Sequence, residues 1–227
     1  MARRPIFVPN IESGSLVNEI SVEFHWYPGM SLQQKKKSVS SLHEAASRKG
    51  VYPILEISTK SELELGRRLS AFNLLLKIGD NQRVSVEAAY QGSKVFTRGG
   101  PYRDFYGLDG KKIKTDERLR NSGDLVAFDF NGISWSLEPK TAFYDWLYVS
   151  ALHQNPSLSS QILEYKGFSD IEFNPEKSIN CQARAAALFV VLYKRNILEF
   201  ALSSQTSFIQ AILGAGASTS FKQENLL

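Results

Sequence analysis

Between residues 20 and 47 the hydrophobic pattern changes from a period of two to a helical period. Ile20 to Trp26 alternate apolar and polar side chains, which is typical of a half-buried strand. Pro28 and Gly29 interrupt this pattern, and Ser31 can cap a helix that runs to about Ser47 and is closed by Gly50. Because a strand and a helix follow each other so closely, the pattern predicts an α+β fold.

The rest of the chain continues this mixture. Further strands are predicted over residues 51–57, 74–78, 83–86, 125–130, 133–137 and 168–173. Further helices are predicted over residues 61–69, 86–96, 141–154, 158–165, 182–194 and 197–213, the one over 141–154 as an amphipathic helix. We find no internal repeat, so the sequence favours one α+β domain.

Turn signals lie between these segments. Asn131-Gly132 separates two predicted strands and is a strong hairpin signal, and Gly79-Asp80-Asn81 predicts a second tight turn. Ser61 and Glu64 have the spacing of a capping box. Residues 102–124 follow Gly99-Gly100-Pro101 and are expected to form a long polar loop, which in a compact domain is usually functional or mobile.

The composition excludes several classes of protein. No segment approaches 18 consecutive apolar residues, so no membrane span is predicted, and the N-terminal residues lack the apolar run of a signal peptide. The single cysteine, Cys181, cannot form an internal disulfide, and His25, His43 and His153 are too scattered for a metal site. We therefore expect a cytoplasmic protein that needs neither a metal nor another cofactor.

Basic residues gather in two stretches of the chain. The formal net charge is only +4, from 27 basic and 23 acidic residues. Within residues 31–50, however, Lys35, Lys36 and Lys37 are adjacent, and a second basic stretch follows Arg98. Such patches can bind the phosphates of a polyanion, but charge alone favours a solvated helix face and a basic loop.

Four polar residues of the predicted helix over 86–96 share one face. Glu87, Tyr90, Gln91 and Lys94 lie at positions i, i+3, i+4 and i+7. A carboxylate beside a sugar can stabilise an oxocarbenium-like transition state and steer a water molecule. An amine can hold a phosphate or form an imine with a ring-opened sugar. The pattern alone also fits an ordinary exposed helix face, so both interpretations remain open.

Three segments together resemble the NADAR (YbiA-like) family. These are SVEAAYQGSKVF at residues 85–96, LSAFNL at residues 69–74, and residues 141–152 followed by Asn155-Pro156-Ser-Leu158. Their order and spacing also agree with the family over about residues 56–195. Residues 24–30 with the QQKKKSVSSLH helix start, and the blocks at 56–60, 170–175 and 178–184, resemble a longer branch encoded beside DarT-type toxins.

The resemblance implies a fold and an activity. We expect a largely helical YbiA-like domain with a small sheet and a hairpin over residues 51–213. A short β-α extension over residues 1–50 would pack on it, and residues 214–227 would form a flexible tail. The branch implies an antitoxin that acts as an N-glycosidase and removes ADP-ribose from guanine bases in DNA, thereby repairing the DNA. The implied partners are ADP-ribosylated DNA, ADP-ribose as product and a cognate DarT-type toxin.

The resemblance and the helical stripe together assign candidate site residues. Glu87 and Lys94 are the candidate catalytic pair. The candidates for substrate binding are Phe72, Asn73, Tyr90, Gln91, Arg98, Arg103, Lys111, Trp146, Glu172, Asn180 and Gln182. Lys35, Lys36 and Lys37 are the candidates for DNA binding. The sequence departs from the general family near residue 180, where it has INCQARAAALF without the Trp-Gly pair, and only Asn180 and Gln182 offer polar counterparts there.

Two other functions remain open at the level of sequence. Some YbiA-like proteins cleave N-glycosidic bonds in phosphoribosyl-amine intermediates of riboflavin synthesis, and this chain shares their motifs. A module that binds nucleic acid or a toxin without turnover would also fit the basic patches. Turnover of ADP-ribosylated DNA that depends on Glu87 and Lys94 would distinguish the predicted enzyme from both.

Overall fold

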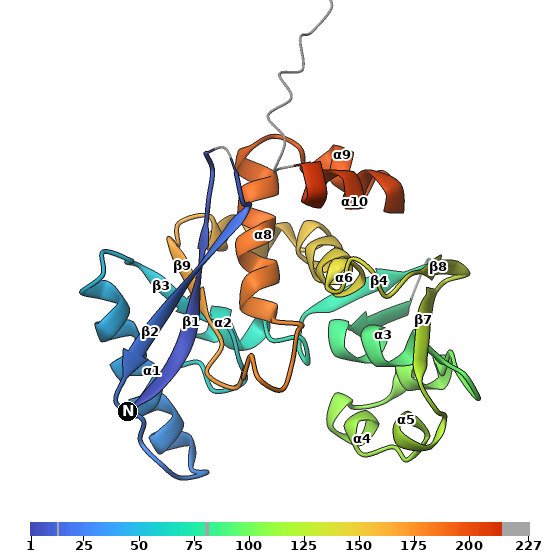
Figure 1. Ribbon diagram of the computed structural model, residues 1–227, viewed down its shortest axis with the longest axis horizontal. Coiled ribbons are helices and arrows are strands. Elements are labelled where there is room, and N and C mark those ends of the chain that lie inside the picture. The colour runs from blue at the N-terminus through green and yellow to red at the C-terminus, as the bar shows by residue number, and fades with distance from the viewer. Residues whose placement is uncertain (13, 80–81, 215–227) are drawn as a thin grey trace, which may run out of the picture.

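Strands and short helices alternate along the chain in the computed structural model (Figure 1). The structure describes residues 1–12, 14–79 and 82–214. The strands are β1 (Ala2–Pro9), β2 (Val17–Phe24), β3 (Ile54–Glu56), β4 (Leu75–Ile78), β5 (Gln82–Ser85), β6 (Lys94–Phe96), β7 (Leu125–Phe130), β8 (Ile133–Trp135) and β9 (Gly167–Ser169). The helices are α1 (Leu32–Ser47), α2 (Glu64–Arg68), α3 (Val86–Gly92), the 3-10 helix η1 (Arg103–Gly107), α4 (Gly110–Lys114), α5 (Arg118–Asn121), α6 (Ala142–His153), α7 (Pro156–Ile162), α8 (Gln182–Lys194), α9 (Leu198–Leu202) and α10 (Gln205–Gly214). The predicted α+β class is confirmed.

One sheet joins the N-terminal strands to strands from later in the chain. Its order is β2-β1-β9-β3. Strand β1 runs antiparallel to β2 over its whole length and pairs with β9 at Phe7 and Phe168, whereas β3 and β9 are parallel. Helix α1 packs on β2, and its Leu42 shares a buried cluster with Ile6 and Val22. Residues 1–50 thus complete a sheet with the rest of the chain, and a domain boundary at residue 50 stays a prediction.

The sequence analysis missed β1. Pro5 and Pro9 lie in this strand, and a proline, which has no amide hydrogen to donate, argues against a strand interior. The start of the next helix is confirmed, because α1 begins at Leu32 and Ser31 accepts a hydrogen bond from the amide of Gln34 at 3.2 Å.

The predicted hairpin at Asn131-Gly132 is confirmed. These two residues connect β7 to β8 with φ angles of 52° and 82°, which is the backbone conformation that favours asparagine and glycine in such turns. Strand β6 pairs with the other edge of β7. Strands β4 and β5 form a second antiparallel pair, and Asp80 and Asn81 of the predicted turn between them lie outside the described residues, as does the predicted tail beyond residue 214.

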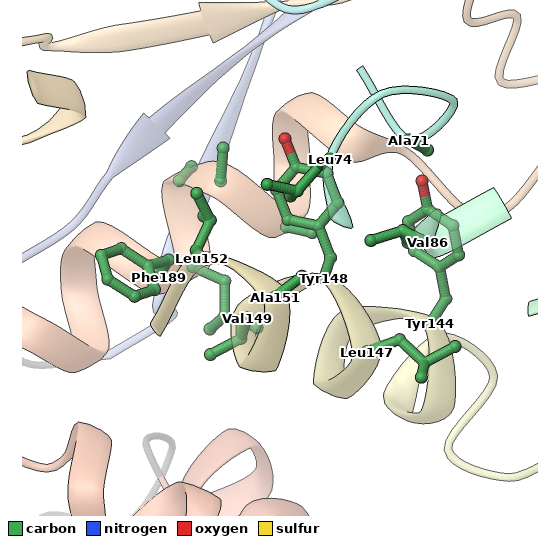
Figure 2. Packing of buried hydrophobic residues seen from close by; sticks show 14 of the residues in the cluster. Ala71, Leu74, Val86, Tyr144, Leu147, Tyr148, Val149, Ala151, Leu152 and Phe189 are labelled. Carbon is green, nitrogen blue, oxygen red and sulfur yellow. The ribbon is translucent and has the colours of Figure 1, made fainter. Parts of the chain in front are cut away.

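Helices α6 and α8 pack against each other at the centre of the main core (Figure 1). Helix α6 is not amphipathic as predicted, because nearly all its side chains are buried. Figure 2 shows its residues Tyr144 and Tyr148 pointing toward Leu74 and Val86. The hydroxyl of Tyr148 donates to the carbonyl of Leu69 at 2.7 Å, so this buried polar group is satisfied. The packing fixes α6 behind α3, which carries the candidate site.

The predicted helix over residues 86–96 is too long. Helix α3 ends at Gly92, where an added Cβ would lie 2.6 Å from the ring of Tyr106. The chain then turns at Ser93, and Lys94 enters β6 opposite Phe128 of β7. The pairing of β6 with β7 stabilises a strand at Lys94 more than the local sequence favours a helix there. Lys94 therefore does not lie on the helical face that the residue spacing predicts.

The predicted long loop over residues 102–124 is also wrong. This segment contains η1, α4 and α5. Phe105 and Ile113 are fully buried in it, and they pack with Ala88 of α3 in a small separate cluster. The segment is mostly polar, so its hydrophobic pattern did not predict these short helices. The few apolar residues in it are enough to hold the helices against α3.

Strand β9 ends at Ser169, whereas the sequence predicts a strand to residue 173. After Ser169 the chain turns, and the amide of Phe173 donates to the carbonyl of Asp170 at 3.1 Å. The alternation predicted for this segment therefore fails. Glu172 and Phe173 both line one cavity, although the strand pattern put them on opposite faces.

Other predicted elements have different bounds. Helix α2 begins one turn after Ser61 and is preceded by Leu63, which makes no side-chain capping bond, so the predicted capping box is wrong. The predicted helix over 197–213 is divided into α9 and α10, because the hydroxyl of Ser204 accepts from the amide of Ser207 and starts a new helix. The strand predicted over 51–57 is β3, and the helix predicted over 158–165 is α7.

Candidate active site

The first turn of α3 holds a carboxylate in a buried position. The hydroxyl of Ser85 caps the helix by accepting from the amide of Ala88 at 3.2 Å. The amide of Glu87 donates to the carbonyl of Ala71 at 2.9 Å, which ties the helix to the segment before β4. The Glu87 residue is only 7% exposed. A negative charge is favoured there by the helix dipole.

Helix α3 faces a cavity of about 450 Å³. The lining also includes the segment before β4, the turn after β9 and the start of α8. The lining residues are Ala71, Phe72, Glu87, Tyr90, Gln91, Lys94, Lys114, Tyr144, Asp170, Glu172, Phe173, Asn174, Lys177, Ser178, Asn180 and Gln182. A cavity of this volume accommodates a ligand of nucleotide size.

The carboxylate of Glu87 contacts two other side chains of the cavity. Its Oε1 accepts from Nε2 of Gln91 at 3.1 Å and lies 3.6 Å from the ammonium of Lys114. Lys114 also lies over the ring of Phe72, 4.6 Å from its centroid. The carboxylate, the amide and a cation therefore meet at one wall of the cavity.

Lys94 reaches the same cavity from β6. Its ammonium lies 5.0 Å from the centroid of the Tyr90 ring. Burial is the main cause that lowers the pKa of Lys94, and Lys114 lowers it further, whereas Glu87 acts in the opposite direction. A lowered pKa increases the fraction of neutral amine, which is the nucleophilic form.

Tyr90 and two amides form the floor of the cavity. The hydroxyl of Tyr90 accepts from Nδ2 of Asn180 at 2.7 Å, and burial raises the pKa of Tyr90 to about 12, so the phenol stays neutral at pH 7. The amide oxygens of Gln91 and Asn180 are buried and have no hydrogen-bond partner among the described residues. Buried acceptors without a donor are costly, so they are suited to the hydroxyl groups of a ligand.

Gln182 lines the cavity but its amide is already fully used. Its oxygen accepts from the amide of Ala71 at 2.7 Å, and its nitrogen donates to the carbonyl of Ile57 and to the carboxyl of Asp170. Gln182 therefore holds three separate segments of the cavity wall together.

Glu172 lies at the rim of the cavity, where Lys35 of α1 forms an ion pair with it at 3.0 Å. Lys35 also lies over the ring of Trp26. Lys36 is 3.8 Å from Glu62, and Lys37 lies over the ring of Tyr27. The predicted DNA-binding lysines are thus partly engaged within the protein, Lys35 most of all.

Sequence reasoning missed several cavity residues, of which Asp170 is the most important. Asp170 follows the last residue of β9, and burial raises the pKa of its carboxyl to about 8, with the nearby charge of Glu56 as the next cause. A carboxylate at the end of a buried strand was the signal in the sequence. The other missed residues are Lys114, Tyr144, Phe173, Asn174, Lys177 and Ser178.

The remaining candidate residues do not line this cavity. Asn73 is exposed and donates to the carbonyl of Arg67 at 2.8 Å, and Trp146 packs on the main core beside Phe130 and Trp135. Arg98 donates to the carbonyl of Asn121, and Arg103 forms an ion pair with Asp129. The side chain of Lys111 lies outside the described part of the structure.

No group of metal-binding side chains occurs among residues 1–12, 14–79 and 82–214. Cys181 is buried at the start of α8, and burial raises the pKa of its thiol well above the ordinary value. Neither observation adds a nucleophile or a ligand set to the cavity. The polar side chains that line the cavity carry carboxyl, amine, amide, phenol and hydroxyl groups.

The fold and the cavity define a class of protein. It is a mixed α+β protein in which one polar cavity of nucleotide size brings a buried carboxylate close to an amine. The chain belongs to the DarT1-associated NADAR antitoxin family, whose model matches residues 2–221. An antitoxin role and a DarT toxin as cognate partner follow from this membership.

Two further findings are negative. No curated protein matches the sequence. In the described part of the chain, no helix has the length and apolar character that crossing a lipid bilayer requires.

Proposed function

We propose that this antitoxin is an N-glycosidase that removes ADP-ribose from guanine bases in DNA. The observation that carries the proposal is that Lys94 and Glu87 line the same cavity, in a chain of the DarT1-associated NADAR family. The enzyme hydrolyses the bond between C1″ of the distal ribose and the exocyclic nitrogen of guanine.

Glu87 orients the distal ribose and supports the positive charge that develops on it. A buried carboxylate is suited to this task because an oxocarbenium-like transition state is stabilised by a nearby negative charge. Gln91 fixes the orientation of the carboxylate through its hydrogen bond of 3.1 Å. The same carboxylate can accept a proton from a ribose hydroxyl or an attacking water.

Lys94 acts as an amine next to the sugar. Its lowered pKa supports a covalent route, in which the neutral amine forms an imine with the ring-opened sugar before water releases ADP-ribose. In the alternative route its charged form stabilises the opened sugar and a phosphate. The two routes differ in whether a covalent lysine adduct exists during turnover.

Other cavity residues hold the substrate. The free amide oxygens of Gln91 and Asn180 accept hydrogen bonds from ribose hydroxyls, and Phe72 offers a ring against which a base can stack. Among the described residues, Lys114 and Lys177 are the cations that line the cavity besides Lys94, so they are better placed for the pyrophosphate than Arg98 and Arg103. Lys36 and Lys37 of α1 remain candidates for the DNA backbone.

The decisive experiment uses the purified protein and an oligonucleotide that carries ADP-ribose on guanine. We expect release of ADP-ribose and restored guanine, and no comparable turnover of a phosphoribosyl-amine of the kind that occurs in riboflavin synthesis. If the protein binds the modified oligonucleotide but releases nothing, it acts as a binding module and the proposal is wrong.

A second measurement distinguishes the two routes for Lys94. Borohydride added during turnover reduces an imine and leaves a stable adduct on the protein, which mass spectrometry locates. The covalent route predicts an adduct at Lys94 that is absent in Lys94→Arg, because arginine cannot form the imine. Full turnover in Lys94→Arg would contradict any role of the amine as nucleophile.

A further inference from the structure

Side chains from α1, β9 and β3 form a hydrogen-bonded chain next to the cavity, and His43 and Glu56 of this chain also line a second pocket beneath α1. Nε2 of His43 lies 2.8 Å from the hydroxyl of Ser169, and this hydroxyl donates to Oε2 of Glu56 at 2.5 Å. Ser169 and Glu56 are paired across the parallel strands β9 and β3. Because Ser169 gives its only hydroxyl proton to Glu56, its oxygen accepts from His43, which therefore carries hydrogen on Nε2.

Three hydrogen-bond donors oppose the effect of burial on the pKa of the Glu56 carboxyl. Its Oε1 accepts from the amide of Ile171 at 2.9 Å, and the hydroxyls of Ser169 and Ser58 add to this. Burial is the larger influence and raises the pKa of Glu56, while these three donors lower it. Burial also lowers the pKa of His43 to about 4, so the imidazole is neutral at pH 7 and acts as an N–H donor.

Asp170 lies between this chain and the cavity. It directly follows Ser169, and its two oxygens accept from the amide of Glu172 at 3.0 Å and from Nε2 of Gln182 at 2.9 Å. Burial first, and then the charge of Glu56, raises the pKa of Asp170 to about 8. A pKa of about 8 leaves the Asp170 carboxyl mostly protonated at pH 7, and this carboxyl lies at the cavity wall.

The other titratable groups around Asp170 do not explain this state. Tyr144 and Tyr148 of α6 and Cys181 before α8 face Asp170, and burial raises the pKa of each well above its ordinary value, so they are neutral below pH 9. Glu172 adds a smaller repulsion and is paired with Lys35. Glu56 is thus the charge that most strongly controls Asp170.

We propose that Asp170 donates a proton to the departing guanine, and that Glu56, held by Ser169 and His43, keeps Asp170 protonated. The proposal rests on the N-glycosidase function proposed above. When the sugar–nitrogen bond breaks, its electron pair stays on the guanine nitrogen, which takes the proton of Asp170. Water then adds its oxygen to the sugar carbon, either directly or at the imine of Lys94, and one proton returns to Asp170, so one water is consumed and guanine and ADP-ribose are released.

This arrangement gives the N-terminal segment a part in catalysis. His43 lies on α1, within the predicted extension, and is linked to Glu56 through the hydroxyl of Ser169. His43, Ser169 and Glu56 are positioning residues in this scheme, whereas Asp170 touches the substrate.

The first test measures the protonation of Asp170 without any substrate. Carboxyl ¹³C NMR of the full chain follows its titration, with the signal assigned by its loss in Asp170→Asn. We expect a midpoint of about 8 in the wild type. In Glu56→Gln, which keeps the acceptor for Ile171 but removes the charge, the midpoint falls by roughly one pH unit or more. An unchanged midpoint in Glu56→Gln, or a wild-type midpoint near 4, overturns the proposal.

Matched variants separate this effect from misfolding. Glu62→Gln removes an exposed carboxylate that borders the neighbouring pocket beneath α1 but lies outside the chain of hydrogen bonds, and it leaves the midpoint unchanged. Ser169→Ala removes one donor to Glu56 with little change of volume, and it lowers the midpoint of Asp170 less than Glu56→Gln does. If Glu56→Gln does not fold, a lowered midpoint of Asp170 in Ser169→Ala supports the control of Asp170 by Glu56. An unchanged midpoint in Ser169→Ala then overturns the proposal.

The second test is the pH profile of turnover on the modified oligonucleotide. Wild-type kcat falls above about pH 8, which is the alkaline limb of the profile. In Glu56→Gln this alkaline limb shifts to lower pH by the same number of pH units as the NMR midpoint. His43→Leu moves the limb in the same direction, whereas His43→Gln, which retains an N–H donor, restores the wild-type profile. A limb that stays in place while the NMR midpoint moves rules out Asp170 as the proton donor. A wild type without turnover rejects the proposed function, and the NMR titration still decides whether Glu56 controls Asp170.

Discussion

Replacement of Glu87 by glutamine removes one negative charge from the cavity and little else. The amide is nearly isosteric with the carboxylate, and its oxygen can still accept from Nε2 of Gln91. The ion pair with Lys114 is lost, but Lys114 is half exposed, and such pairs contribute at most about 1 kcal/mol to stability. We therefore expect Glu87→Gln to fold, with a free energy of unfolding within about 1 kcal/mol of the wild type.

The effect on turnover is much larger. Loss of a group that transfers protons and supports charge in the transition state lowers kcat by roughly 100-fold, which corresponds to about 2.7 kcal/mol. On the covalent route a change in the protonation of Lys94 cannot cause this loss, because Glu87 raises the pKa of Lys94, so its removal leaves the amine more neutral than before. On that route the decrease therefore reports the charge of Glu87 itself.

The assay measures single-turnover release of ADP-ribose from the guanine-modified oligonucleotide, with urea unfolding of the same samples. Glu64→Gln is the matched control, since it changes an exposed glutamate in the first turn of α2 that does not line the cavity. If Glu87→Gln retains turnover within about threefold of the wild type, the catalytic role of Glu87 is wrong.

Two further predictions concern the support of the cavity. Arg184→Met leaves the buried carboxylate of Asp145 without its ion pair of 2.5 Å, so urea unfolding at pH 7 shows a loss of about 3 kcal/mol, and a loss below about 1 kcal/mol contradicts this. Gly110→Ala places a Cβ 2.7 Å from the ring of Phe72, so we expect the ring to shift and kcat/KM to fall by roughly tenfold, in line with the 1–3 kcal/mol of overpacking. Gly107→Ala meets no atom within 4 Å and should keep wild-type kinetics, and equal kinetics in both variants would show that the contact of Gly110 is unimportant.

Local sequence determined those elements whose signal lies within a few residues. The cap at Ser31 and the turn at Asn131-Gly132 occur where the sequence predicts them, because side-chain capping and a positive φ angle depend on the residue itself. The family motif around Glu87 and Tyr90 was also visible in the sequence, and both residues line the cavity. The family itself followed from such local motifs.

Tertiary structure decided what lies between distant segments. Lys94 joins Glu87 through strand pairing with β7, although the helix that the spacing predicts ends at Gly92. Strand β1 exists because β2 and β9 pair with it, despite the prolines that argue against a strand. Residue spacing within one segment cannot report such pairings, since their free energy comes from groups far away along the chain.

The same limit applies to charge. The sequence gives no sign that Asp170 has an unusual pKa, which is raised because folding buries its carboxyl and brings Glu56 of β3 near it. The sequence thus determined which chemical groups the site contains. Only the folded chain decided which of them are charged, because desolvation and electrostatic repulsion depend on three-dimensional distance.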